Sequence, residues 1–167
     1  MMNWLQGSSE MAERVRQHDW ASTPLGELEQ WPDVLKTTVA LCFASSFPQS
    51  IIWGPHLITL YNDAFIPILG DKPDSLGRAF SEIWREAWDD IGPIANAAFE
   101  GHPTYIENYP LVVERGNGPE QAYFTFCYSP VRDPQGRVVG MLDTVTETPR
   151  PYSSLAAWPY WMQLAAP

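Results

Sequence analysis

The fold of this chain is decided by residues 104–146, which read TYIENYPLVVERGNGPEQAYFTFCYSPVRDPQGRVVGMLDTVT. The clusters Gly-Asn-Gly-Pro and Asp-Pro-Gln-Gly are typical of turns, and the runs between them are rich in the aromatic and β-branched residues that favour strands. Consecutive strands joined by short turns form an antiparallel meander. We therefore predict three strands, over residues 104–115, 121–132 and 137–146.

The middle strand of this meander presents two different faces, because successive side chains of a strand alternate in direction. One face carries Ala122, Phe124, Phe126 and Tyr128, and the other carries Tyr123, Thr125, Cys127 and Ser129. The second face is less polar than the solvated face of a sheet usually is. We expect it to be covered by a helix that begins near Trp31, by a partner subunit, or by both.

A β-hairpin is predicted ahead of the meander, because strand-like runs at residues 50–53 and 56–61 flank a Gly-Pro turn. After the hairpin, Asn62 or Asp63 can cap a short helix at residues 64–69. For Asn62 we expect a structural role, in which its amide satisfies backbone groups at the strand-to-helix junction.

Two further segments have helical spacing. Apolar residues from Trp31 to about Ser45 recur as on an amphipathic helix of about four turns. Residues 80–99 also place large apolar side chains on one face, and Gly92-Pro93 is expected to break or kink that helix. The resulting order of helices and strands predicts an α+β fold with an antiparallel sheet.

Composition limits the function classes. The chain has 167 residues, enough for one domain, and its net charge of −10 disfavours binding to nucleic acid or to an anionic membrane surface. Its two cysteines, Cys42 and Cys127, have no spacing typical of a disulfide framework or a thiolate metal site. The N-terminus lacks the features of a signal peptide, and no apolar run is long enough to span a bilayer, so a cytoplasmic location is expected.

Several blocks of sequence resemble the PAS family. They are FPQSIIWG at 47–54, LYNDA at 60–64, ILG at 68–70, EIW at 82–84, IGP at 91–93 and YFTFCYSPV at 123–131. In this order they are similar to the N-terminal PAS sensory domains of bacterial hybrid sensor histidine kinases. The resemblance implies a five-stranded antiparallel sheet with short helices on one face and an N-terminal amphipathic helix. It also implies three parts: a helix and connector at 1–30, the PAS domain at 31–147, and a tail containing Pro and Trp at 148–167.

The same resemblance implies a sensory or signalling module and not an enzyme. Such a module binds a small organic molecule or mediates protein–protein contacts, so we expect a homodimer and a histidine kinase or other signalling protein as a partner. Flavin is not expected, because the reactive cysteine block Asn-Cys-Arg of the flavin-binding branch is missing. Haem is not expected either, because the long helix holds no histidine and His102 lies beyond its end. We predict no cofactor and no metal.

A ligand pocket is one of two interpretations of the aromatic residues. The candidate walls lie on the helices and on the meander: Phe65, Ile68, Leu69, Trp84, Trp88, Ile91, Phe124 and Phe126. These side chains either surround a small molecule or simply fill the core, and large aromatic rings favour the second interpretation.

The alternative from another function class is a small α+β enzyme, an isomerase or hydratase that uses a buried Asp beside a Tyr. Its candidate residues are Asp63, Asp89, Tyr61 and Tyr105. An acid with a strongly raised pKa next to a tyrosine in one pocket would favour this alternative.

Overall fold

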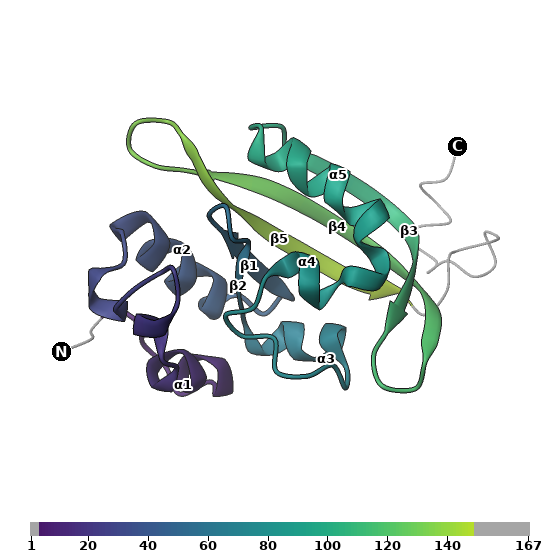
Figure 1. Cartoon of the computed structure of the whole chain (residues 1–167), viewed down its shortest axis with the longest axis horizontal. Helices are drawn as coiled ribbons and strands as arrows, with labels where there is room; N and C mark the ends of the chain where they lie inside the picture. The colour runs from purple at the N-terminus through teal and green to yellow at the C-terminus, as the bar shows by residue number, and fades with distance from the viewer. Residues whose placement is uncertain (1–3, 149–167) are drawn as a thin grey trace, which may run out of the picture.

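A single sheet organises the computed structural model, which describes residues 4–148 (Figure 1). Its five strands are antiparallel to their neighbours and follow the order β2-β1-β5-β4-β3. Their bounds are β1 Gln49–Trp53, β2 Ile58–Tyr61, β3 Thr104–Glu114, β4 Pro119–Arg132 and β5 Val138–Thr148. The expected α+β class and five-stranded antiparallel sheet are confirmed.

The three-stranded meander forms where the turn residues predicted it. β3 pairs with β4, and β4 pairs with β5. Gly116, Gly118 and Gly136 take φ values of 117°, 83° and 82° in the two turns, a left-handed backbone that glycine adopts without a steric penalty. Each of the three strands extends to within two residues of its predicted bounds.

The hairpin of β1 and β2 joins the sheet through a contact between distant parts of the chain. β1 pairs with β5, so that Ser50 lies opposite Asp143 and Ile52 opposite Met141. Gly140 of β5 has no room for a side chain, because a Cβ there would lie 2.6 Å from the ring of Trp53. This close approach joins the hairpin to the meander in one sheet.

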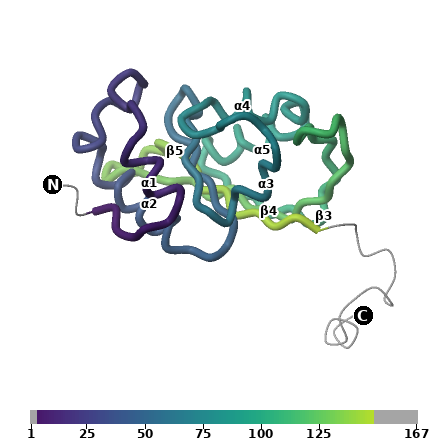
Figure 2. The backbone as a smooth tube through the Cα atoms, turned by 90° about the horizontal axis from the view of Figure 1, so that it is seen from below, coloured from purple at the N-terminus to yellow at the C-terminus, as the bar shows by residue number. Residues whose placement is uncertain are grey.

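Short helices cover one face of the sheet (Figure 2). They are α3 Ile66–Leu69, α4 Phe80–Ile83 and α5 Trp88–Phe99, with the 3-10 turns η3 Asp63–Phe65 and η4 Arg85–Ala87. The predicted break at Gly92-Pro93 is wrong: Pro93 lies inside α5, and the interruption falls at Trp84, between α4 and η4. A proline removes one helical hydrogen bond, and the packing of Ile91, Ala95 and Ala98 in the core outweighs that loss.

The N-terminal elements pack beside the hairpin and belong to the same core. They are α1 Glu10–Gln17, η1 Trp20–Ser22, η2 Leu28–Gln30 and α2 Asp33–Ala44. The helix predicted from Trp31 is α2, and its buried residues Leu35, Val39 and Cys42 lie on the side that contacts β1 and β2. The tail predicted at 148–167 lies outside the described residues, apart from Thr148 at the end of β5.

No helix in the described part of the chain has both the length and the apolar composition needed to cross a bilayer.

Candidate functional site

A small cavity lies between the sheet and the helices α3 to α5, with a volume of about 30 Å³. Its walls combine aromatic and aliphatic side chains with a single carboxylate: Phe65, Ile68, Phe80, Trp84, Ile91, Leu111, Val113, Phe124, Phe126, Tyr128, Asp143 and Val145. Six of the eight expected wall residues are among them. The other two, Leu69 and Trp88, lie elsewhere, and the Trp88 ring meets Phe80 edge-on at 6.3 Å.

The carboxylate in this wall belongs to Asp143, at the centre of the sheet. Asp143 lies opposite Ser50 on one neighbouring strand and opposite Tyr128 on the other. Directly opposed residues on adjacent strands present their side chains on the same face. The three polar side chains therefore form a row across β1, β5 and β4 on the cavity side of the sheet.

Asp143 is only 4% exposed and is incompletely hydrogen-bonded. Its Oδ2 accepts a hydrogen bond from Ser50 Oγ at 3.1 Å, whereas Oδ1 has no hydrogen-bond partner among the described residues. Burial disfavours the charged form and raises the pKa of Asp143 to about 7, although the Ser50 hydrogen bond acts in the opposite direction. At neutral pH this carboxyl group is thus divided between its two protonation states.

Tyr128 adds a second buried polar group beside the carboxylate. Its ring lies 5.0 Å from that of Phe126 and meets Phe80 edge-on at 6.3 Å. Burial, and then the neighbouring Asp143, raise the pKa of Tyr128 well above its usual value. Tyr128 therefore stays a neutral phenol at physiological pH.

Sequence reasoning missed Asp143 and its place in the wall. The signal was present, because Asp143 falls in phase with Met141 and Val145, and both are buried. A charged residue at an inward position of a central strand is unusual unless it is paired.

Asn62 occupies the junction between β2 and the helices and is 2% exposed. Its Oδ1 accepts hydrogen bonds from the backbone N–H groups of Gln49 and Phe65, at 3.1 and 3.2 Å. Its Nδ2 donates to the carbonyls of Cys42, Ser45 and Phe47, at 2.9, 3.3 and 2.8 Å. One amide thereby ties the end of α2, the start of β1 and the start of η3 together, and it does not line the cavity.

Comparison with known proteins identifies the architecture that carries this cavity. No protein-family model and no curated protein matches the sequence. Among solved structures, the LOV protein of Rhodobacter sphaeroides superimposes with a TM-score of 0.55 at 18% identity, over 74% of this chain and 73% of that one. The PAS domain of the fruit-fly ELK potassium channel superimposes with a TM-score of 0.53 at 10% identity, over 70% of this chain and 98% of that one. The chain has the PAS fold.

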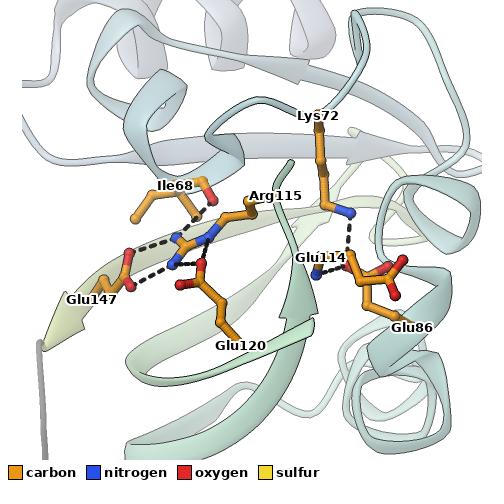
Figure 3. Close-up of polar contacts among 7 residues, drawn as sticks. All are labelled: Ile68, Lys72, Glu86, Glu114, Arg115, Glu120 and Glu147. Carbon is orange, nitrogen blue, oxygen red and sulfur yellow. Dashed lines mark hydrogen bonds and ion pairs between the residues drawn. The ribbon is translucent and has the colours of Figure 1, made fainter. Parts of the chain in front are cut away.

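In this PAS fold, a cluster of ion pairs joins the cavity helices to the end of the last strand (Figure 3). Arg115, just after β3, holds Glu147 of β5 through two hydrogen bonds of 2.7 and 2.8 Å. The same guanidinium donates to Glu120 at 2.7 Å and to the carbonyl of Ile68 at 3.3 Å. Since Ile68 lines the cavity, Arg115 links one cavity wall to the C-terminal end of β5.

A second ion pair, between Lys72 and Glu86, lies next to this cluster (Figure 3). Lys72 pairs with Glu86 at 2.6 Å and lies over the Trp84 ring, 4.9 Å from its centre. Glu86 also accepts a hydrogen bond from the backbone N–H of Glu114 at 3.2 Å. These contacts fix Trp84, a cavity wall residue, against the loop after α3 and the end of β3.

The structure does not bring the four enzyme candidates together. Asp63 accepts hydrogen bonds from the backbone N–H groups of Glu10 and Met11 and so caps α1. Asp89 is exposed on α5, Tyr61 is buried in β2, and Tyr105 is 67% exposed on β3. The arrangement set out as favouring an enzyme, a raised-pKa acid beside a tyrosine, occurs instead at Asp143 and Tyr128.

The cavity is small compared with the sites that hold large cofactors. Sites for drug-sized ligands and cofactors occupy about 300–1,000 Å³, whereas this cavity has about 30 Å³. Neither cysteine and none of the three histidines is among its wall residues. Burial raises the pKa of the Cys42 thiol to about 12, which leaves it protonated and unreactive. The absence of haem and flavin stays a prediction.

Proposed function

We propose that this chain is a cytoplasmic sensory module of a bacterial signalling pathway, and that its core cavity binds a small polar molecule at Asp143. The observation that carries the proposal is the Oδ1 of a buried carboxylate, which has no hydrogen-bond partner within residues 4–148 and lies in the wall of a mainly apolar cavity. An unpartnered buried polar group costs about 1–3 kcal/mol. A ligand that donates a hydrogen bond to Oδ1 removes this cost. The free energy of ligand binding is therefore linked to the stability of the core.

The contacts of Arg115 support a route by which such binding reaches the end of the domain. Phe65 and Ile68 line the cavity on η3 and α3, and the carbonyl of Ile68 accepts from Arg115. Arg115 in turn holds Glu147, one residue from the end of β5. A ligand that fits only one conformation of α3 would raise the population of that conformation. The contacts of Arg115 with Ile68 and Glu147 would change with it.

Native mass spectrometry of the freshly purified full chain tests the proposal. We expect a mass above that of the polypeptide, by the mass of one small molecule, in the wild-type protein. The Asp143→Leu variant, which replaces the carboxylate by a larger apolar side chain of the same branching, should lack this excess. A small-molecule library screened by thermal shift extends the test to ligands that dissociate during purification.

Two results would remove the ligand-binding proposal. One is a wild-type protein with the polypeptide mass alone that no library compound stabilises. The other is a ligand retained unchanged by Asp143→Leu, which would place binding elsewhere on the molecule.

We also propose that the module forms a homodimer through the outer face of β3 and β4, and that a histidine kinase or other signalling protein is its partner. Tyr105 and Val112 on that face are 67% and 52% exposed. Tyr123, Thr125 and Cys127 continue the same face on β4 and are half-buried. In Figure 2 the helices α3 to α5 lie on the opposite side of these strands. The Tyr105 hydroxyl donates to the exposed carboxylate of Glu107 at 2.7 Å, at one end of this otherwise uncharged row of side chains. Such a sheet surface is a suitable contact for a second copy.

Sedimentation of the full chain tests the dimer. Val112→Lys should convert a dimeric wild type into a monomer, because a charge in the centre of an apolar contact is costly to desolvate. Asn96→Lys, an exposed change on α5, is the matched control and should stay dimeric. Val39 on α2 is an unsuitable site, because it is 0% exposed and a charge there would unfold the domain. A wild type that sediments as a monomer at all concentrations removes this proposal.

An acid–base enzyme is the second candidate, and the Asp143–Tyr128 pair is the observation that favours it. A carboxyl group with a pKa of about 7 has the protonation equilibrium that general acid–base catalysis uses. Against it, a cavity of about 30 Å³ has room for only a few non-hydrogen atoms. We therefore prefer the non-enzymatic sensory module.

A further inference from the structure

We propose that the ligand recognised at Asp143 is a small protonated amine of two or three non-hydrogen atoms, of the size of methylammonium or ethylammonium. This inference rests on the proposed function and names the chemical class of the molecule that the cavity would bind. It is carried by three features of the cavity: its unpaired carboxylate oxygen, its aromatic walls and its size.

The carboxylate selects for a cation. Ser50 satisfies only Oδ2, and Oδ1 remains without a partner among the described residues. None of the cavity wall residues is Lys, Arg or His, so the ionised carboxylate has no positive partner in the wall. A buried charge is stable only when it is paired, and an ammonium group supplies both the charge and the N–H donor. An anionic ligand would face the opposite situation and be excluded.

The remaining walls suit the same ligand. Six of the wall residues are aromatic: Phe65, Phe80, Trp84, Phe124, Phe126 and Tyr128. The faces of aromatic rings attract cations by about 0.5–2 kcal/mol per ring, more when the cation is desolvated. The aromatic side chains also make apolar contacts with the methyl or ethyl group of the ligand. A wall open to solvent would not favour these contacts. A carboxylate surrounded by aromatic rings is therefore a site for a small organic cation.

The cavity volume limits the ligand to the smallest amines. The cavity of about 30 Å³ has roughly twice the space that one water molecule needs. The walls must therefore adjust slightly even for ethylammonium, and a quaternary ammonium such as tetramethylammonium exceeds the space. This size limit separates binding in the cavity from simple attraction of cations to a protein with a net charge of −10.

Binding should be coupled to proton release. An amine binds the ionised carboxylate, so a protonated Asp143 must first lose its proton to solvent, whereas the ammonium group keeps its own. The ionisable groups that act on Asp143 or are acted on by it are Tyr128 on β4 and Cys42 on α2, and both stay neutral near pH 7. With the pKa of Asp143 at about 7, binding at pH 7 releases about half a proton, and apparent affinity rises roughly tenfold from pH 6 to pH 8.

The experiment is a titration of the full chain with methylammonium chloride, followed by calorimetry in two buffers of different ionisation enthalpy. Methanol serves as the neutral control of the same size, and tetramethylammonium chloride as the cation that is too large. Asp143→Asn keeps the shape of the side chain and removes its charge, and circular dichroism checks that the variant is folded.

We expect methylammonium to bind at millimolar concentration with release of about half a proton at pH 7. Methanol and tetramethylammonium should not bind, and Asp143→Asn should weaken methylammonium binding by roughly 30-fold or more. Equal binding of methanol, or of methylammonium by Asp143→Asn, would overturn the assignment to an amine, as would the absence of methylammonium binding. Those results leave the proposed sensory function to its own test, because a co-purified neutral molecule lost in Asp143→Leu would still support it.

Discussion

Asp143→Asn is expected to stabilise the protein at pH 8, by about 1–3 kcal/mol, and to have little effect at pH 4. The carboxyl group has a pKa of about 7 in the folded protein against an ordinary value of 3.8, a difference worth about 4 kcal/mol. Between these values the folded state binds more protons than the unfolded state. Wild-type stability therefore falls as the pH rises from about 4 to about 7, and the loss is complete above pH 7.

The asparagine variant does not ionise, so it escapes this loss. It does not recover the full 4 kcal/mol, because its buried amide N–H groups also need partners. Chemical denaturation at pH 4 and pH 8 measures the effect as the difference between variant and wild type. Asp89→Asn, at an exposed site on α5, is the matched control and should change stability by less than about 0.5 kcal/mol at either pH. A variant that is less stable than wild type at pH 8 would show that Asp143 has a compensating partner.

Asn62→Ala is expected to destabilise the fold by about 3–5 kcal/mol, a large effect for one substitution. The change removes all five hydrogen bonds of the amide. The Phe65 N–H and the Cys42 carbonyl each keep a backbone hydrogen bond, so the groups that lose this partner without replacement are the Gln49 N–H and the carbonyls of Ser45 and Phe47. Each buried group left unsatisfied costs about 1–3 kcal/mol, and water that enters the junction recovers part of this cost. Urea denaturation monitored by tryptophan fluorescence gives the free energy of unfolding.

Two further variants define what Asn62 contributes. Asn62→Asp keeps the acceptor for Gln49 and Phe65 but places a carboxylate oxygen against the three carbonyls, so it should also destabilise. Asn96→Ala, on the exposed side of α5, should leave stability within about 0.5 kcal/mol of wild type. If Asn62→Ala stays within about 1 kcal/mol of wild type, the junction is held by other contacts.

Much of the candidate site could be predicted, because its walls come from local patterns. Phe124 and Phe126 follow from the alternation of β4, and Phe65, Ile68, Trp84 and Ile91 from the apolar residues of the helices. Leu69 and Trp88 satisfy the same patterns and yet lie outside the cavity. Periodicity assigns a residue to an apolar face, but it does not say whether that residue faces a cavity or a neighbouring ring.

The sequence by itself determined the strands of the meander, the β1–β2 hairpin, the helix α2 and the PAS fold. The strands and helices follow from alternation, helical spacing and turn residues, which act over a few neighbouring residues. The PAS fold is implied by the resemblance of several sequence blocks to that family. Only the tertiary structure decided the continuation of α5 through Pro93, because the buried face of that helix outweighs a local signal. It also decided the surroundings of Asp143. Its partner Ser50 lies 93 residues away in the chain, and the register between distant strands depends on the packing of the whole core.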